Sequence, residues 1–337
     1  MLAWTTGCGP APRDTAQGIR VWCQQGQEAE NRAMREMAAA FNEAHAGRNL
    51  QVHITFFPDY QYTEKVTIAA AARDLPDVLP LDGPTVAQFA NAHLLRPLAG
   101  WFSEDERTDF APSIRAQGEI DGTLYALGAF DSAMVLYYDR EKLAAAGVEP
   151  PESLEGWTWD EFLDACARLK QAGFDPVALH MDSTGDEWYT YAFSPVIWSA
   201  GGRLMDEETH QVDGVLNSPR NAETLRRWQE VFERDYADRA PVDPNPFGSG
   251  RTAMDWSGHW MARAHLEAKG DRLGAMPLPA MGDAPAAACG SWCWGLTRDA
   301  PDPDAAALWL RWVLDPVQGI RPIVSANGAV PARASAY

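Results

Sequence analysis

The feature that most constrains the fold is an alternation of short apolar strands with amphipathic helices, which the sequence shows twice. Residues 19–22 form an apolar strand pattern, a helical pattern follows and ends at Gly47, and residues 50–56 alternate between apolar and polar side chains. The order starts again after about residue 131 with the apolar run 134–138. Strands that alternate with helices along a chain predict an α/β fold with a mainly parallel sheet.

Helix-start signals strengthen this prediction in the second half of the chain. Thr158 followed by Glu161 forms a capping box, in which each residue caps the other's backbone. Ser218-Pro219 and Asp302-Pro303 each place a capping side chain directly before a proline, which is the preferred order at a helix start. With 337 residues, the chain is long enough for two such α/β domains.

Composition excludes several classes of protein. The chain carries 28 Lys+Arg and 47 Asp+Glu, a net charge of −19, which argues against nucleic-acid binding because that requires cationic side chains. With 46% hydrophobic residues the chain is too apolar to be disordered. No run approaches the 18 apolar residues of a membrane-spanning helix. The 14 tryptophans are either core side chains or aromatic platforms for a ligand.

Generic catalytic and metal motifs are absent from the sequence. It contains no phosphate-binding loop of the Walker type, no H-E-x-x-H and no G-x-S-x-G. Paired carboxylates for glycoside hydrolysis remain an open alternative, because their separation is a three-dimensional property. Cys289 and Cys293 lie close together but have no further ligands at metal spacing, so we expect no structural metal. The four cysteines after Cys8 predict at most one disulfide; the other two are Cys23 and Cys166.

Residues 1–18 predict a lipoprotein-like N-terminus followed by a tether. Thr6 and Gly7 precede Cys8, and Gly9–Gly18 is rich in Gly, Pro and Ala. This arrangement resembles the end of a bacterial lipoprotein signal, in which small residues precede a cysteine that becomes lipidated. We therefore expect Cys8 to be the lipidated residue and the following segment to be a flexible tether.

Nine short segments form an ordered set of motifs. The segments include a PDV strand, a TWDEF helix start and an F-x-x-GRTAM run. They lie at 72–78, 136–148, 157–162, 201–202, 216–219, 247–254, 258–260, 277–279 and 328–333. In this common order over residues 19–333, they resemble bacterial extracellular solute-binding proteins of the sugar-uptake type, the family 1 relatives of maltose-binding protein that serve ABC transporters.

The resemblance implies two α/β lobes joined by a hinge of crossing strands, which is the type II periplasmic-binding-protein fold. Carried onto this sequence, the crossings fall near 128–133, 276–279 and 327–331. The N-lobe would comprise 19–130 plus 280–326, and the C-lobe 131–278, with 327–337 crossing back. The family usually continues with further helices that complete the C-lobe, and these are expected to be missing here.

A sugar-binding cleft needs aromatic planes for the C–H faces of the ring and polar groups for its hydroxyls. Residues that match the family's ligand-facing places, or that follow the carboxyl end of a strand, supply both kinds of group. These candidates are Gln25, Asp82, Asp131, Ser132, Tyr189, Tyr191, Trp198, Trp256, Trp260, Trp292, Trp294 and Arg333. Helical tryptophans such as Trp228 and Trp309 are expected in the core.

The resulting prediction is an extracytoplasmic substrate-binding component of an ABC importer, in the periplasm or on the outer face of the cytoplasmic membrane. It would capture a mono- or oligosaccharide between the lobes, close by hinge motion, use no cofactor and catalyse no reaction. Its partners would be the sugar and the transmembrane permease subunits; we expect a monomer that touches the membrane only through a lipid anchor. The alternatives are a polyamine or other cationic solute, which the acidity makes conceivable, and a glycoside hydrolase.

Overall fold

The computed structural model describes residues 18–48, 50–151, 154–181, 188–282 and 284–337. By its internal contacts the chain divides into two compact units. Unit 1 comprises Met1–Asp131 and Gly290–Tyr337, as far as these are described, and unit 2 comprises Ser132–Cys289. Within the described residues, no helix combines the length and the apolarity needed to cross a membrane.

Unit 1 is built on a five-stranded sheet with the order β2-β1-β3-β12-β6. The first three strands in this order run parallel, and β12 is antiparallel to both of its neighbours. Two short pairs, β4 with β5 and β7 with β13, lie outside this sheet. The strands are β1 (Ile19–Gln25), β2 (Val52–Pro58), β3 (Val78–Asp82), β4 (Glu119–Ile120), β5 (Thr123–Leu124), β6 (Ala126–Gly128), β7 (Phe130–Asp131), β12 (Trp292–Leu296) and β13 (Val330–Pro331).

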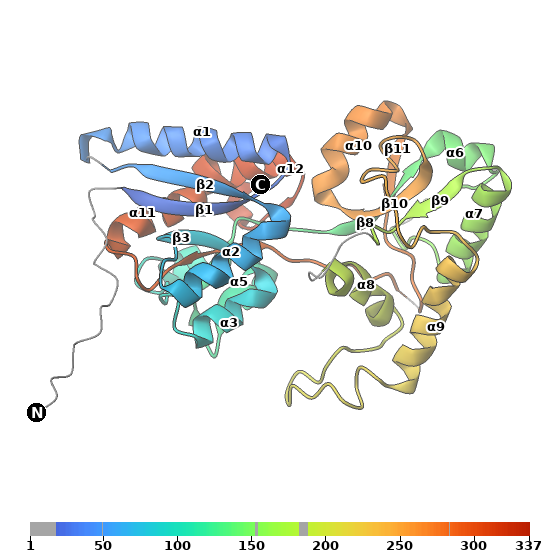
Figure 1. The fold of residues 1–337 in the computed structure, drawn as a ribbon, viewed down its shortest axis with the longest axis horizontal. Helices are drawn as coiled ribbons and strands as arrows, with labels where there is room; N and C mark the ends of the chain where they lie inside the picture. The colour runs from blue at the N-terminus through green and yellow to red at the C-terminus, as the bar shows by residue number, and fades with distance from the viewer. Residues whose placement is uncertain (1–17, 49, 152–153, 182–187, 283) are drawn as a thin grey trace, which may run out of the picture. The chain divides into compact units, whose positions relative to one another are not determined.

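Helices cover both faces of the unit 1 sheet (Figure 1). Helices α1, α11 and α12 pack on one face, where Phe41 and Trp309 meet edge to face at 5.4 Å, and α2 and α3 pack on the other. The two faces therefore have separate hydrophobic cores. The helices are α1 (Glu28–Ala44), α2 (Asp59–Ala72), α3 (Val86–Asn91), α4 (Glu104–Thr108), α5 (Pro112–Gly118), α11 (Pro303–Val313) and α12 (Arg321–Asn327).

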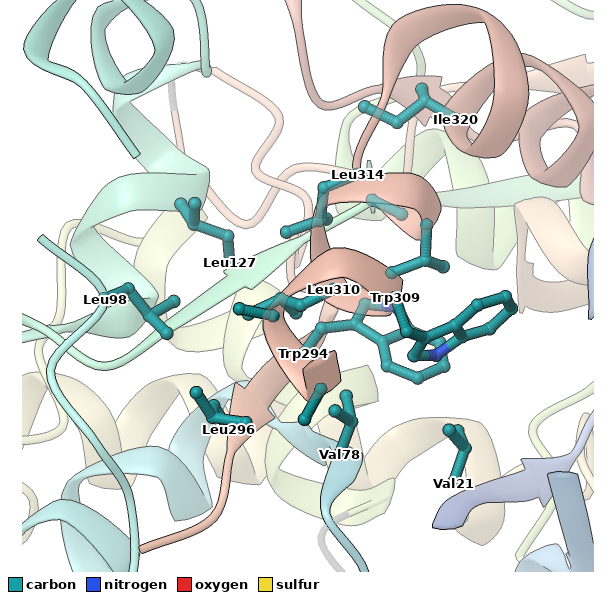
Figure 2. Close-up of a cluster of buried hydrophobic side chains, with 14 of the residues drawn as sticks. Val21, Val78, Leu98, Leu127, Trp294, Leu296, Trp309, Leu310, Leu314 and Ile320 are labelled. Atoms are coloured by element: carbon teal, nitrogen blue, oxygen red, sulfur yellow. The ribbon is translucent and has the colours of Figure 1, made fainter. Parts of the chain in front are cut away.

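The larger core of unit 1 joins the sheet to α11. Figure 2 shows Trp294 from β12 beside Leu310 and Trp309 of α11, with Val21 and Val78 from the neighbouring strands. Trp309 and Val21 are fully buried and Trp294 is almost so. Burying a large side chain of this kind stabilises a fold by about 1.5–3 kcal/mol, so this cluster holds the sheet and the helix together.

Unit 2 contains a four-stranded sheet with the order β11-β8-β10-β9. Strand β10 is antiparallel to β8 and parallel to β9, and β11 is antiparallel to β8. The strands are β8 (Met134–Asp139), β9 (Asp175–Ala178), β10 (Thr252–Gly258) and β11 (Leu273–Met276). The helices are α6 (Arg140–Ala145), α7 (Trp159–Gln171), α8 (Trp188–Ser199), α9 (Pro219–Glu233) and α10 (Ala262–Lys269).

The predicted helix starts are confirmed. The Thr158 hydroxyl accepts a hydrogen bond from the Glu161 amide and the Glu161 carboxylate reaches back, which completes the capping box of α7. Ser218 and Asp302 likewise cap α9 and α11 in front of a proline. These caps depend on neighbours in sequence, which is why a local pattern was enough to find them.

The prediction of a mainly parallel sheet is wrong for unit 2, because β8 pairs antiparallel on both sides. The first strand is also longer than the apolar pattern 19–22 predicted, since β1 continues to Gln25. The division of the chain differs from the expected one at three places. Asp131 belongs to unit 1, residues 280–289 belong to unit 2, and 327–337 stay with unit 1, where β13 pairs with β7.

Candidate functional site

In unit 1, polar side chains gather where the parallel strands end. Strand β1 ends at Gln25 and its neighbour β3 ends at Asp82, so the two carboxyl ends lie at the same edge of the sheet. Strand β12 runs in the opposite direction and therefore begins at this edge with Trp292. In open α/β sheets, this edge is where ligands bind.

Asp82 and Trp292 stand directly opposite each other in the β3–β12 ladder. The Trp292 side chain is half-buried, and its ring meets the edge of Tyr62 at a centroid distance of 5.6 Å. Tyr62 is itself fixed, because its hydroxyl donates to the Pro80 carbonyl at 2.8 Å. Within the described part of the chain, no donor reaches the Asp82 carboxylate. The pair thus offers a held aromatic ring beside an available anionic acceptor.

The chain that leads into Trp292 is positioned by two polar side chains. Asp131 accepts hydrogen bonds from the Ser113 hydroxyl at 2.6 Å and from the Gly290 amide at 3.0 Å. Gln117 accepts from the Ser291 amide at 2.8 Å. The Asp131 side chain therefore fixes the backbone at Gly290. A carboxylate that accepts two hydrogen bonds still has further acceptor positions.

One polar residue at this edge was missed in the sequence. Gln24, the second-to-last residue of β1, has a buried side-chain oxygen that accepts no hydrogen bond from the described residues. A buried acceptor without a donor costs about 1–3 kcal/mol. The apolar strand pattern stops at residue 22, so the sequence did not place Gln24 in the strand.

The carboxylates at this edge also affect a neighbouring thiol. Burial raises the pKa of Cys293 far above its usual range, and the nearby charges of Asp82 and Asp131 raise it further. Cys293 is therefore a neutral core thiol, and the two carboxylates give the edge a negative potential.

In unit 2, aromatic side chains gather beyond the end of β10. We call Trp188, Tyr191 and Trp260 the aromatic cluster. The Trp260 ring lies 6.2 Å from both of the other rings, edge to face with Trp188 and tilted against Tyr191. All three side chains are half-buried. Ser132 joins the cluster, because its hydroxyl and that of Tyr191 share a hydrogen bond of 2.5 Å.

Local sequence explains why Trp260 sits in the cluster. Gly258 ends β10, and a Cβ at that position would lie 2.0 Å from the Trp260 ring, so only glycine lets the ring fold back there. The next residue, His259, meets the Trp260 ring edge to face at 5.3 Å. Burial lowers the pKa of His259 to about 4, so this imidazole is neutral at pH 7.

Trp188 was the aromatic residue that sequence reasoning missed. It lies three residues before Tyr191 on α8, which puts both rings on one face of the helix. That spacing was the available signal. Tyr189, which was predicted, lies between them, is 39% exposed and donates its hydroxyl to the Met181 carbonyl at 3.0 Å. Trp198 lies two turns further along α8 and is 42% exposed.

Three predicted ligand contacts are corrected by the structure. Trp256 is 1% exposed, packs in the unit 2 core and donates to the Ala192 carbonyl at 2.9 Å. Trp294 is 5% exposed in the unit 1 core. Both rings are packed inside these cores, so neither has a face open to a ligand. Arg333 donates to Asp109 at 2.7 Å and to the Leu314 carbonyl, and it lies over the Phe110 ring, so its donors are used in tying down the last residues.

A cavity of about 520 Å³ opens elsewhere in unit 2, beside β9 and the segment 235–246. Its charged lining is largely paired, with Lys170 on Asp235 at 2.5 Å and Arg251 on both Asp175 and Asp238. None of the residues predicted to bind ligand lines it. We therefore regard it as a feature of the edge strand. Each unit has its own candidate binding surface: Gln25, Asp82 and Trp292 at the strand ends of unit 1, and the aromatic cluster in unit 2.

Metal and cysteine predictions can be followed only in the described residues. Among them, no group of three or more His, Cys, Asp or Glu side chains is arranged to hold a metal ion. Cys23, Cys166 and Cys293 are free, buried thiols. Cys8, the expected lipidation residue, lies outside the described residues.

The sequence profile of the bacterial extracellular solute-binding protein family matches residues 25–320. The chain belongs to this family. The family's description names solute binding and an extracellular location, and it names no reaction. The match covers both units, including the strand ends of unit 1 and the aromatic cluster of unit 2.

One relative at the sequence level is the maltotriose-binding protein of Pyrococcus abyssi (strain GE5 / Orsay), which is 28% identical over 229 residues. The alignment covers 66% of this chain and 45% of the relative. The chain spans about half the length of the curated relatives that it matches.

Solved structures show the same fold. The GacH receptor of Streptomyces glaucescens GLA.O, known unliganded and with acarbose, superposes with a TM-score of 0.78 at 23% identity, over 95% of this chain and 81% of that one. UgpB from Mycobacterium tuberculosis, in complex with glycerophosphocholine, gives 0.79 at 22% identity over 97% and 83%. The fold is therefore that of the type II periplasmic binding proteins, as the resemblance implied.

Proposed function

We propose that this protein captures an oligosaccharide for uptake by an ABC importer. The observation that carries the proposal is the Asp82–Trp292 pair of unit 1, a held indole beside a carboxylate with no donor among the described residues. The C–H faces of a sugar ring pack on such an indole, and its hydroxyls donate to such a carboxylate in charge-assisted hydrogen bonds.

The aromatic cluster of unit 2 supports the same ligand class. Trp260 and Tyr191 offer half-buried rings, and the Ser132–Tyr191 hydrogen bond holds two hydroxyls at their edge. In the proposal, the sugar contacts both units, and its binding favours a closed arrangement by hinge motion. The name of the Pyrococcus abyssi relative and the acarbose complexes of the GacH receptor agree with an oligosaccharide.

The proposed partners follow from the family. The protein would deliver its ligand to the transmembrane permease subunits of the importer on the outer side of the cytoplasmic membrane. It would be a monomer held to the membrane by a lipid on Cys8. No bond of the ligand is broken in this function, so no residue is assigned a catalytic role.

A cationic solute such as a polyamine is the second candidate, and one observation favours it. Asp82 and Asp131 both lie close enough to Cys293 to raise its pKa, so two carboxylates share one edge with the Trp292 ring. Carboxylates around an aromatic ring are a suitable site for a cation. The sugar remains our first candidate because Asp131 already accepts two hydrogen bonds from the protein.

A thermal-shift panel separates these candidates. The wild-type protein would be heated with maltose to maltopentaose, acarbose, glycerophosphocholine and spermidine. A ligand at about 1,000 times its Kd stabilises the folded state by about 4 kcal/mol, so a cognate sugar should raise the Tm by several degrees. A shift with spermidine and with none of the sugars would overturn the proposal.

A further inference from the structure

A fully buried carboxylate in unit 2 links two histidines that are far apart in sequence. Asp255, in the middle of β10, has no solvent exposure. One of its oxygens lies 2.6 Å from Nε2 of His180, and the other lies 2.7 Å from Nε2 of His265. His180 follows β9, and His265 belongs to α10, so one side chain joins three segments of the unit.

The protonation states of this group follow from its surroundings. Burial pushes the pKa of Asp255 up, but hydrogen bonds from His180 and His265, together with their charges, bring it below the usual range. Asp255 is therefore an anion that accepts from both rings. Nδ1 of His265 is buried and has no partner among the described residues.

His180 contacts the aromatic cluster directly. His180 has a positive φ of 51°, an unfavourable backbone conformation for a residue with a side chain. Such strain persists only where other contacts fix it, and the bond to Asp255 is one of them. The His180 ring meets Trp188 edge to face at 5.9 Å, and Trp188 meets Trp260 edge to face at 6.2 Å.

His265 is connected to the same cluster through the backbone, because its helix follows the segment that carries Trp260. Helix α10 begins at Ala262, directly after the short helical turn His259–Met261 that carries Trp260. His265 is packed between the rings of Tyr137 and Phe247, at centroid distances of 4.9 and 4.7 Å. Its bond to Asp255 therefore fixes the first turn of α10 against β10. The Tyr137 hydroxyl donates to the Gly258 carbonyl at 3.1 Å and holds the end of β10 from the same side.

We propose that Asp255 is a positioning residue for ligand binding, which sets the geometry of Trp188 and Trp260 through His180 and His265. The inference rests on the proposed function for its effect on affinity, but the placement of the two indoles is a property of the free protein. Loss of either hydrogen bond releases one side of the cluster while the hydrophobic core of unit 2, with Trp256 and Phe162, stays intact.

Asp255→Asn is the sharpest variant. An asparagine amide presents one acceptor and one donor, so one of the two histidine N–H groups must face a donor instead of an acceptor. Asp77→Asn is the matched control, because Asp77 is a buried carboxylate of unit 1 that accepts from the Arg20 amide at 2.8 Å, at the opposite end of β3 from Asp82. Each variant replaces one carboxylate oxygen with an amide nitrogen at a buried site.

Two measurements are made on wild type and both variants. The first is the near-ultraviolet circular dichroism of the tryptophan bands in the ligand-free protein, to which all 14 tryptophans contribute. The spectra of Trp188→Phe and Trp260→Phe identify the part that comes from these two rings. The second is the Kd for maltotriose by calorimetry. We expect Asp255→Asn to alter the tryptophan bands and to weaken binding about tenfold. We expect Asp77→Asn to lower the Tm and to leave both other quantities as in wild type.

A second pair of variants covers the case in which Asp255→Asn does not fold. His180 is 21% exposed in its side chain and tolerates substitution better. His180→Gln can still donate an N–H to Asp255, whereas His180→Leu cannot, and both carry the same backbone strain. Rescue by glutamine, with tryptophan bands and affinity near wild type while leucine changes both, supports the proposal.

The outcomes separate this inference from the proposed function. Equal tryptophan bands in wild type and Asp255→Asn, or equal behaviour of the two His180 variants, would overturn the positioning role. If wild type binds no maltotriose, the proposed sugar function fails, and the circular dichroism of the free proteins still decides the role of Asp255.

Discussion

In unit 1, the parallel strands end in polar side chains. In unit 2, aromatic rings lie close together beyond the end of β10. In unit 1, Asp82 presents an acceptor without a donor among the described residues, and Trp292 supplies a single ring. In unit 2, Trp188, Tyr191 and Trp260 form a cluster in which the hydroxyls of Tyr191 and Ser132 are bonded to each other. The comparison teaches that hydroxyl recognition would be concentrated in unit 1 and ring stacking in unit 2.

Position within a strand decides what each tryptophan does. Trp294 and Trp256 lie inside strands that are paired on both sides, and both are buried in a core. Trp292 begins its strand, and Trp260 lies just beyond the end of one, and both remain half-buried. The tests below are ordered from the largest expected effect to the smallest, and each probes this contrast between core and strand end.

The largest effect is expected in the core of unit 1. Trp309→Ala should destabilise the protein by about 3–5 kcal/mol, because Trp309 is fully buried and its loss leaves a cavity against Phe41. The affinity of the remaining folded protein for maltotriose should stay within about twofold of wild type. Chemical denaturation and calorimetry measure the two quantities. A large loss of affinity in fully folded Trp309→Ala would contradict the claim that core tryptophans stabilise the fold without contributing to ligand binding.

The stacking role of unit 2 predicts the next effect. Trp260→Ala should weaken maltotriose binding about 50-fold, since it removes the central ring of the aromatic cluster. Trp101→Ala is the control, a half-buried tryptophan of unit 1 that donates to Asp304 at 2.9 Å. Titration calorimetry on both variants gives the comparison. Equal affinities would show that Trp260 does not touch the sugar.

The two units should respond to acid in different pH ranges. Burial lowers the pKa of His259 in unit 2 to about 4, below the value of about 6.5 for an unfolded histidine. The unfolded state then binds the proton first, so stability is lost as the pH falls from 6.5 to 4. Because the ring is partly exposed, we expect a loss of roughly 2 kcal/mol.

Unit 1 has a different acid-sensitive group. A hydrogen bond from Arg311 is the main cause that lowers the pKa of Glu106 to about 2, so its contribution is lost only as the pH falls from about 4.5 to 2. Denaturation curves at pH 7, 5 and 3.5 test the contrast, with His259→Gln as the control that should flatten the change between pH 6.5 and 4. A wild-type stability that is constant over that range would contradict it.

Hydroxyl recognition in unit 1 predicts the smallest effect. Asp82→Asn should weaken maltotriose binding about fivefold, because the amide keeps one acceptor but loses the charge that strengthens its hydrogen bonds. Glu28→Gln, an exposed carboxylate on α1, is the control for the change in net charge. An unchanged Kd for Asp82→Asn would remove Asp82 from the site and leave recognition to unit 2.

The sequence allowed the prediction of features that depend on neighbours along the chain. Helix caps such as Thr158, and the strand-end residues Asp82 and Trp292, could be located from local patterns and from the family resemblance. Antiparallel pairing of β8 could not, because it depends on which distant strand lies beside it. The same holds for the burial of Trp256, which needed knowledge of both its strand neighbours.

The link between Asp255 and its two histidines lay further beyond sequence reasoning. His180 and Asp255 are 75 residues apart, and no local pattern connects them. His265 lies ten residues after Asp255 on a helix that folds back over the strand. A buried acid between two histidines becomes visible only when three segments are brought together, which is a property of the tertiary fold.

The central claim is that an oligosaccharide, and no cationic solute, is the ligand. Isothermal titration of the wild-type protein with maltotriose, and separately with spermidine, tests it most directly. The account predicts one binding site for maltotriose with a Kd in the micromolar range or below, corresponding to about −8 kcal/mol or more, and no heat with spermidine. Saturable binding of spermidine, together with no heat from maltotriose or longer maltodextrins, would contradict it.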